Sequence, residues 1–143
     1  MVTQKLLDLV KEFEGCRLEA YPDPKGIWTI GYGDTGPAIK EGLVWTQEAA
    51  ESTLIARLMS FAGQVQSCVE VEINQNQLDA LTSFSYNLGI GALKSSHLLT
   101  LLNQADFVAA ANEFDLWVHI GHSVAEGLVR RRAAEKALFL ESV

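Results

Sequence analysis

The sequence predicts an α+β protein that is mainly helical, with a small β-hairpin lobe near the N-terminus and a helical lobe after it, joined by a long helix. Two observations lead to this prediction. Apolar residues recur at helical spacing over most of the chain, whereas residues 17–36 mix aromatic residues with glycine, proline and aspartate. Strands and helices that are segregated along the chain in this way are typical of α+β architecture.

The first predicted element is a helix over residues 3–13. Leu6, Val10 and Phe13 recur there at helical spacing, and Gly15 follows as a stop signal. In residues 17–36 apolar and aromatic residues are interspersed with glycine, proline and aspartate. This pattern predicts a β-hairpin or three short strands.

A long second helix is expected to begin after Thr46. Threonine is a good N-cap residue, and Glu48 and Glu51 lie in or near the first helical turn, where negative charge is favourable. Apolar residues then repeat at helical spacing to about Ser67. The helix is long for a chain of 143 residues, so we expect it to connect the two lobes.

Only helices are expected after residue 68. Asn74 and Gln77 have the spacing of a capping box, and Gly89 ends the helix that they begin. We expect residues 1–143 to form a single domain, with the hairpin lobe at about 14–45 and the helical lobe at about 68–143 plus the N-terminal helix. Three further helices are predicted: a short one after Ser95 or Ser96, one that Asp106 caps and that continues through Trp117 until Gly121 breaks it, and a final one over residues 128–140.

The composition argues against several classes of protein. The formal net charge is −7, which does not suit nucleic-acid binding. The apolar runs are short and interrupted, so no membrane-spanning helix is predicted. Residues 1–13 lack the basic start, apolar centre and cleavage site of a secretory signal. We therefore expect the protein to accumulate in the cytoplasm.

The two cysteines, Cys16 and Cys68, do not form a metal-binding pattern. A cytoplasmic protein of this size needs no disulfide, so two reduced thiols are expected, although a disulfide between them stays an alternative. Cys16 lies two residues after Glu14, but no neighbouring histidine or helix N-terminus is evident that would activate its thiol as a nucleophile.

Three residues near the N-terminus have the chemistry of a hydrolytic site. Glu14 closes the first helix, Asp23 lies in a proline-flanked turn, and Thr29 lies on an expected strand. Two carboxylates and a hydroxyl in different settings can divide the work of glycosidic bond hydrolysis. Each residue also has an ordinary explanation, because most glutamates are solvated, aspartate is common in turns and threonine favours strands.

The spacing of these three residues resembles that of a known family. Glu-x8-Asp-x5-Thr, with TIGYG around the threonine, resembles the catalytic signature of phage-type lysozymes, the muramidase endolysins of glycoside hydrolase family 24. The later segments DALTSFSYNLGIGAL and WVHIGHSVAEGLVRRRAAEKALF resemble the middle-helix segment and the C-terminal motif of that family. The resemblance covers nearly the whole chain, in the same order.

The resemblance implies a lysozyme-like fold and a muramidase. The expected reaction is hydrolysis of the β-1,4 bond between N-acetylmuramic acid and N-acetylglucosamine in peptidoglycan, for lysis of a host cell. Glu14 is expected to protonate the leaving oxygen, and Asp23, with Thr29, to activate a water molecule or to stabilise the oxocarbenium-like transition state. No metal ion or organic cofactor is expected.

Two further residues are candidates for supporting roles. Arg131, in the middle of the run Arg130–Arg132, is expected from the resemblance to reach the Glu14 carboxylate, although a solvated arginine is the alternative. Asp34 follows TIGYG, where the family commonly has a supporting histidine. It is either a harmless surface substitution or an added negative charge near the cleft, and we hypothesise that it alters the pH optimum.

A cleft between two lobes is a natural place for an extended sugar chain to bind. Tyr21 and Tyr32 are candidates to offer ring faces to the sugars, although aromatic residues of a hairpin more often pack in a core. The net charge of −7 is unfavourable for this interaction, because bacterial cell walls are anionic.

Two rival functions stay open. A lytic transglycosylase needs a catalytic glutamate but no carboxylate to activate water, so Asp23 favours hydrolysis over it. A non-catalytic peptidoglycan-binding module has no reason to keep all three candidate residues. The expected partner is therefore the glycan strand of peptidoglycan, with neither nucleic acid nor stable membrane insertion, and the chain is expected to act as a monomer. The resemblance implies that a holin releases the protein from the host cytoplasm to act on the wall in the periplasm.

Overall fold

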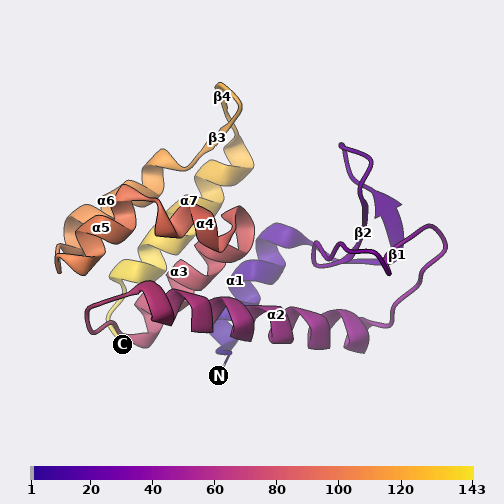
Figure 1. Cartoon of the computed structure of the whole chain (residues 1–143), viewed down its shortest axis with the longest axis horizontal. Coiled ribbons are helices and arrows are strands. Elements are labelled where there is room, and N and C mark those ends of the chain that lie inside the picture. Colours follow the sequence, from indigo (N-terminus) through magenta and orange to yellow (C-terminus); the bar gives the residue numbers. More distant parts are fainter. Residues whose placement is uncertain (1) are drawn as a thin grey trace.

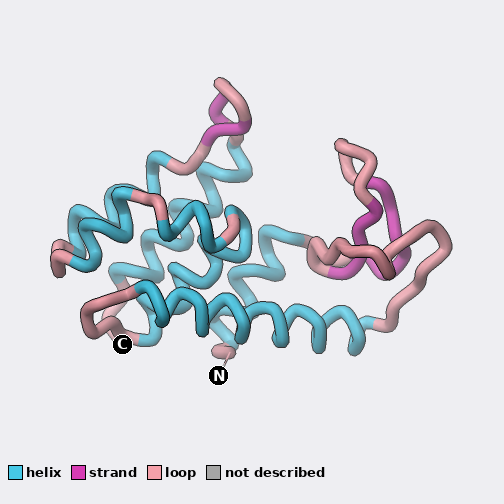
Figure 2. The backbone as a smooth tube through the Cα atoms, viewed as in Figure 1, coloured by secondary structure: helices cyan, strands magenta, loops and turns pink. Residues whose placement is uncertain are grey.

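The computed structural model describes residues 2–143, so Met1, the first residue of the segment compared above with a secretory signal, lies outside it. The described residues form a mainly helical molecule with two small antiparallel hairpins (Figure 1 and Figure 2). The α+β prediction is confirmed. The elements are α1 (Gln4–Glu14), β1 (Arg17–Pro22), β2 (Trp28–Gly31), α2 (Gln47–Cys68), α3 (Gln75–Leu88), α4 (Ile90–Lys94), α5 (His97–Asn103), α6 (Phe107–Glu113), the 3-10 helix η1 (Phe114–Leu116), β3 (His119–Ile120), β4 (Ser123–Val124) and α7 (Glu126–Leu140).

Side-chain caps start five of these helices where a polar residue precedes an apolar repeat. The cap oxygen accepts a hydrogen bond from a backbone N–H of the first turn, which has no partner inside the helix. The predicted capping box at the start of α3 is confirmed, because the Asn74 and Gln77 side chains each bond the other's backbone N–H. The five capping residues are Thr3, Thr46, Asn74, Ser96 and Asp106.

The helix α2 connects the two parts of the molecule, as predicted. It runs along one side of the structure from the β1–β2 hairpin to the helical part (Figure 1). Its first half packs on α1 in one apolar cluster, and its last turns contribute Val65 to a second cluster around α3. Phe84 of α3 lies at the centre of this second cluster, with its ring edge-on to Phe114 and Trp117 at centroid distances of 5.6 and 5.4 Å.

The hairpin β1–β2 places two of the candidate residues. Tyr21 pairs with Thr29, so Thr29 lies on the strand that faces the end of β1. The turn between the strands is closed by Asp23, whose backbone N–H donates to the Ile27 carbonyl at 2.9 Å. Gly26 has a φ of 81° in this turn, a conformation that glycine adopts without steric cost.

The region after α5 differs from its prediction. The helix α6 ends at Glu113 rather than continuing through Trp117, and the hairpin β3–β4 follows, so the expectation of helices alone was wrong. Gly121 has a φ of 62° at the tip of this hairpin. The pattern gave no sign of it because each strand has only two residues and both are exposed, so no alternation of buried and exposed positions exists to be seen.

No helix within residues 2–143 has both the length and the apolar character needed to cross a membrane.

Candidate active site

Glu14 is the last residue of α1, and the end of that helix presents its carboxylate to the rest of the site. Gly15 ends the helix with a φ of 66° and bonds back to the Lys11 carbonyl. The Glu14 side chain is 19% exposed. The turn after β2 lies against it, because a Cβ atom placed on Gly33 would be 3.3 Å from Glu14 Oε1. A side chain at this position would crowd Glu14 and would be strained at the existing φ of 88°.

Arg131 makes the expected contact with Glu14. Its Nη1 donates to Glu14 Oε2 at 2.6 Å, across 117 residues of sequence. The alternative of a solvated arginine is wrong for this position, since Arg131 is only 3% exposed. The three consecutive arginines point in different directions: Arg130 is exposed, whereas Arg132 is completely buried and donates from Nη2 to Asn87 Oδ1 at 2.6 Å.

A buried glutamate joins the two inner arginines. Glu135 Oε2 lies 3.3 Å from Arg131 Nε, and Glu135 Oε1 lies 2.9 Å from Arg132 Nε. The Ser83 hydroxyl of α3 donates to the same carboxylate at 2.5 Å. Burial raises the pKa of Glu135, against the opposing effect of both arginines, and burial lowers the pKa of Arg132.

Asp23 lies, partly exposed, in the turn of the β1–β2 hairpin. Its Oδ1 accepts hydrogen bonds from the backbone N–H groups of Lys25 and Ile27, at 2.8 and 2.9 Å. These bonds fix the side chain within the predicted turn, and they leave Oδ2 without a hydrogen bond to any residue in 2–143. The carboxylate is thus held in place and partly open to solvent.

Thr29 and Tyr21 lie side by side on the paired strands. Thr29 is 5% exposed, and its hydroxyl donates to the Ile27 carbonyl at 2.9 Å, so its lone pairs stay available to accept. Tyr21 is partly exposed, and the guanidinium of Arg17 stacks 4.3 Å from its ring centroid. One face of the Tyr21 ring is therefore already covered by a cation.

Tyr32 does not offer a face to a sugar. It is 4% exposed, and its ring belongs to the apolar cluster between α1 and α2. Its hydroxyl accepts from the Gln47 side chain at 3.0 Å. The expectation of a substrate contact is wrong for this residue, because the turn after β2 directs the side chain inward rather than along the hairpin surface.

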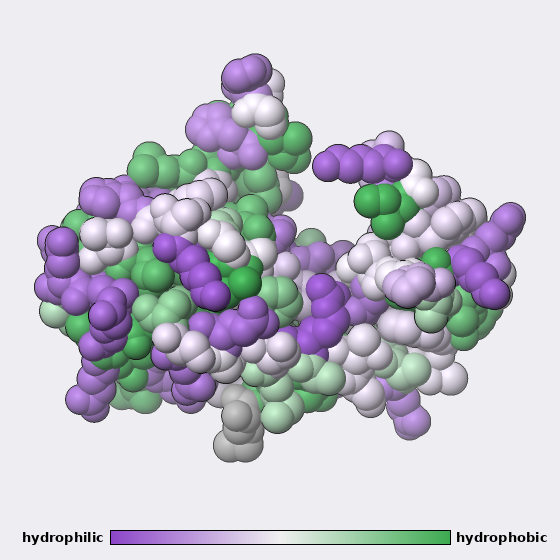
Figure 3. Space-filling model, in the orientation of Figure 1, coloured by the Kyte–Doolittle hydropathy of each residue, from purple (hydrophilic) through white to green (hydrophobic). Residues whose placement is uncertain are grey.

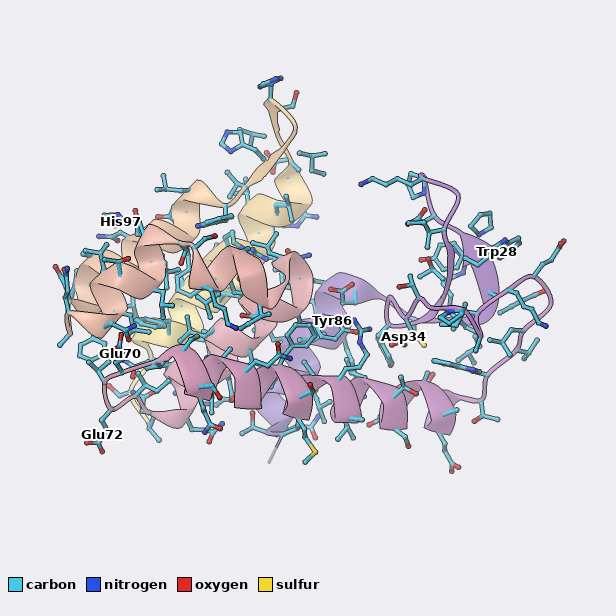
Figure 4. The ribbon with its side chains drawn as sticks, in the orientation of Figure 1. Trp28, Asp34, Glu70, Glu72, Tyr86 and His97 are labelled. Carbon is cyan, nitrogen blue, oxygen red and sulfur yellow. The ribbon has the colours of Figure 1, made fainter. Side chains whose placement is uncertain are left out.

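Asp34 is not a surface substitution either. It is 4% exposed, and its Oδ1 accepts from Arg57 Nη1 of α2 at 2.7 Å. The same Arg57 nitrogen donates to the Tyr86 hydroxyl, which in turn donates to the Tyr32 carbonyl at 2.6 Å. Figure 4 shows Asp34 and Tyr86 on the same side of α2, where the hairpin part meets the helices. Burial raises the pKa of Tyr86, so its hydroxyl keeps its proton and acts as this donor.

A pocket of about 400 Å³ opens beside Glu14. Its walls come from the end of α1, from α3, from the β3–β4 hairpin and from the start of α7, and they include Asn87, Ile120, Arg130 and Arg131. Figure 3 shows the molecular surface hollowed between the β3–β4 hairpin and the part that carries β1 and β2. Glu14 borders this pocket, whereas Asp23 and Thr29 do not line it.

Both cysteine thiols are free in the structure. Burial raises the pKa of Cys68, whose thiol lies 3.3 Å from the Val65 carbonyl, so this thiol is poorly disposed to ionise. Within residues 2–143 no three His, Cys, Asp or Glu side chains are grouped so as to hold a metal ion.

Four residues of this region were not predicted from the sequence: Arg57, Tyr86, Ser83 and Glu135. Glu135 had a readable signal, because it follows Arg131 by four residues and Arg132 by three, the spacings at which side chains on one helix meet. Arg57 and Tyr86 had none, since their contacts join elements that are distant in sequence.

Two curated proteins with similar sequences are endolysins of phages. The chain is 44% identical over 142 residues to an endolysin of Bacillus phage B103, covering 97% of this chain and 54% of that protein. It thus spans about half the length of this relative. It is 39% identical over 142 residues to an endolysin of Acyrthosiphon pisum secondary endosymbiont phage 1, covering 96% of this chain and 97% of that protein.

Among solved structures, the muramidase domain of SpmX from Asticaccaulis excentricus superimposes with a TM-score of 0.91. It is 38% identical and the alignment covers 99% of both chains. The family model that describes phage lysozymes matches residues 11–135, a range that includes Glu14, Asp23, Thr29 and Arg131. With most of its length matched by that model, the chain belongs to the phage lysozyme family.

Proposed function

We propose that this chain is a muramidase that hydrolyses the β-1,4 bond between N-acetylmuramic acid and N-acetylglucosamine in peptidoglycan, in the course of host cell lysis. Membership of the phage lysozyme family supports the class of reaction. The observation that supports the catalytic role of this site is the pairing of Glu14 with buried Arg131 at the edge of a pocket, near a hairpin that carries a partly exposed Asp23.

Glu14 acts as the general acid that protonates the oxygen of the leaving sugar. Its position suits this role because its carboxylate is only 19% exposed and is held at a fixed place by Arg131 and by the turn at Gly33. A general acid gains from such fixed placement, because proton transfer requires hydrogen-bond distance to the leaving oxygen.

Asp23 supplies the second carboxylate of the reaction, and Thr29 lies on the same hairpin. Its carboxylate is oriented by two backbone N–H donors, those of Lys25 and Ile27. An ionised carboxylate either activates water or stabilises positive charge on the sugar ring. Thr29 lies on β2 opposite Tyr21, and its hydroxyl oxygen accepts a hydrogen bond from a water molecule.

The substrate is the glycan strand of peptidoglycan, bound in the hollow between the two hairpins by a single domain acting as a monomer. The protein waits in the host cytoplasm until a holin releases it, and it then acts on the wall in the periplasm, as the resemblance to phage-type lysozymes implies. The endolysin relatives support the cell wall as the place of action.

Digestion of purified peptidoglycan, followed by mass spectrometry of the fragments, tests this proposal. We expect reducing N-acetylmuramic acid ends from the wild type and a loss of at least about a hundredfold in rate for Glu14→Gln. Glu12→Gln is the matched control, because it makes the same change two residues earlier on α1, at the wall of the same pocket. Anhydro-muramic ends would instead establish a lytic transglycosylase, and wall binding without cleavage would establish a binding module.

A further inference from the structure

Arg131 is shared by two carboxylates of unequal exposure. Its Nη1 donates to Glu14, which borders the pocket, and its Nε donates to Glu135, which is completely buried. Arg131 is itself 3% exposed, so solvent does little to screen either contact. The charge on Glu135 therefore bears directly on the charge that Arg131 presents to Glu14.

Glu135 has the surroundings of an ionised carboxylate. Arg131 Nη2 donates to the Ser83 carbonyl and lies 3.4 Å from the Ser83 hydroxyl, which donates in turn to Glu135 Oε2. Arg132 Nε lies on the other side of the same carboxylate, at 2.9 Å from Oε1. With Glu14, these groups form an alternating row of two negative and two positive charges that is neutral as a whole: Glu14, Arg131, Glu135 and Arg132.

A cation next to Glu14 conflicts with the role of Glu14 as an acid. A general acid must hold its proton when the substrate binds, but a guanidinium at 2.6 Å favours the ionised form of a carboxyl group. A second carboxylate on the same guanidinium offsets part of that effect. The other charged groups around Glu14 are Glu12 of α1, Arg130 of α7, and the Asp34–Arg57 pair behind Tyr86.

We propose that Glu135 is a positioning residue for the proposed reaction, and that its carboxylate takes up part of the charge of Arg131 so that Glu14 can hold the proton it donates. This inference rests on the proposed role of Glu14. Glu135 does not touch the substrate, since it is buried between α7 and α3. It acts only through Arg131.

The pH–activity profile of two variants tests the proposal. In Glu135→Gln, Glu14 is the only carboxylate that still pairs with Arg131. The alkaline limb of the profile therefore moves to lower pH, by on the order of one unit. In Arg132→Met, Arg131 is the only arginine that still pairs with Glu135, so Glu135 offsets more of the charge of Arg131. The alkaline limb therefore moves to higher pH. A residue needed only for packing would reduce the amount of folded enzyme and leave the position of the limb unchanged.

Asp115→Asn is the matched control, because it removes one negative charge from an exposed ion pair with Lys136 of the same helix α7. We expect its alkaline limb to coincide with that of the wild type. Folded Glu135→Gln and Arg132→Met proteins whose limbs stay in place, or shift in the same direction, would overturn the proposal.

A second measurement does not depend on the folding of Glu135→Gln or Arg132→Met, and it does not require enzymatic activity. The side-chain carboxyl of Glu135 is followed by ¹³C NMR during a pH titration of the wild type and of Glu14→Gln, with resonances assigned through bonds. Because the two carboxylates compete for Arg131, we expect Glu135 to ionise at lower pH in Glu14→Gln. Coincident titration curves would overturn the coupling, whereas a wild type that releases no reducing ends would overturn only the proposed function.

Discussion

Asp34 connects the hairpin part to the helices through its ion pair with Arg57 of α2. The Asp34 side chain is 5% exposed and its partner Arg57 is 34% exposed, so the pair is partly screened. We expect Asp34→Asn to lower the free energy of unfolding by ~1–3 kcal/mol, because Arg57 loses its only carboxylate partner in residues 2–143 and a buried acceptor is replaced. Urea denaturation monitored by circular dichroism measures the change.

Asp115→Asn is the control for this substitution too, because its ion pair with Lys136 is exposed and is expected to contribute only ~0.2–1 kcal/mol. A double-mutant cycle with Arg57→Gln separates the pair from its neighbours, and a coupling energy of ~0.5–3 kcal/mol is expected. If Asp34→Asn costs no more than Asp115→Asn, the ion pair with Arg57 does not stabilise the junction.

Single residues were predicted well where their role depends on local pattern and poorly where it depends on burial. Glu14 at a helix end and Asp23 in a turn lie where the sequence placed them. Tyr32 and Asp34 were expected near the cleft, but tertiary packing buries both. Nothing in one sequence distinguishes an inward from an outward side chain in a turn, since no periodicity applies there.

The start of α3 carries a prediction at the scale of a single element. In the capping box, Asn74 Oδ1 accepts from the Gln77 backbone N–H at 2.8 Å, and Gln77 Oε1 accepts from the Asn74 backbone N–H at 2.9 Å. Asn74→Ala removes the first bond and leaves the backbone donor of the second in place, so we expect a loss of ~1 kcal/mol in the free energy of unfolding. Urea denaturation again measures it.

Asn112→Ala is the matched control, because Asn112 is exposed inside α6 and alanine is the better helix former there. We expect that variant to be as stable as the wild type or slightly more stable. Equal stability of Asn74→Ala and Asn112→Ala would show that the capping box contributes nothing measurable.

Elements with a polar cap and a long apolar repeat were predicted close to their observed bounds, whereas short elements were not. The starts of α2 and α3 were placed correctly from Thr46 and Asn74, since a cap is a local interaction between neighbouring residues. The helix α4 has five residues and the hairpin β3–β4 has two residues in each strand, too few for any repeat to appear. Their positions depend on the helices against which they rest.

At the scale of the whole molecule, the arrangement of the parts follows from the length of α2 and from two separate apolar clusters. The sequence predicted the two parts and their connection, because the change from helical spacing to turn-rich hairpin is abrupt. The contact between Glu14 and Arg131 was expected only from the family resemblance, and nothing predicted that Ser83 of α3 and Glu135 of α7 meet Arg131 inside the molecule. That meeting requires the crossing of three helices, which single-sequence patterns do not encode.

The overall charge leads to a prediction about how the protein meets its proposed substrate. With a formal net charge of −7, we expect the protein to be repelled by an anionic wall at low ionic strength. Salt screens that repulsion, because the Debye length falls from ~30 Å at 0.01 M to ~10 Å at 0.1 M. We therefore expect the initial rate of wall digestion to rise between these two salt concentrations, as the turbidity of suspended walls would show.

Glu72→Lys tests whether net charge causes this rise. Glu72 is exposed in the connection between α2 and α3, far from Asp34 and Tyr86 at the junction (Figure 4). The substitution changes the formal net charge from −7 to −5, and Glu72→Gln changes it from −7 to −6. We expect the initial rate of wall digestion at 0.01 M salt to increase from the wild type to Glu72→Gln and again to Glu72→Lys. At 0.1 M salt we expect the three rates to converge. Because neither variant alters the site, a salt dependence that is identical in all three proteins would show that the local charges around the pocket, rather than the charge of the whole molecule, govern the encounter with the wall.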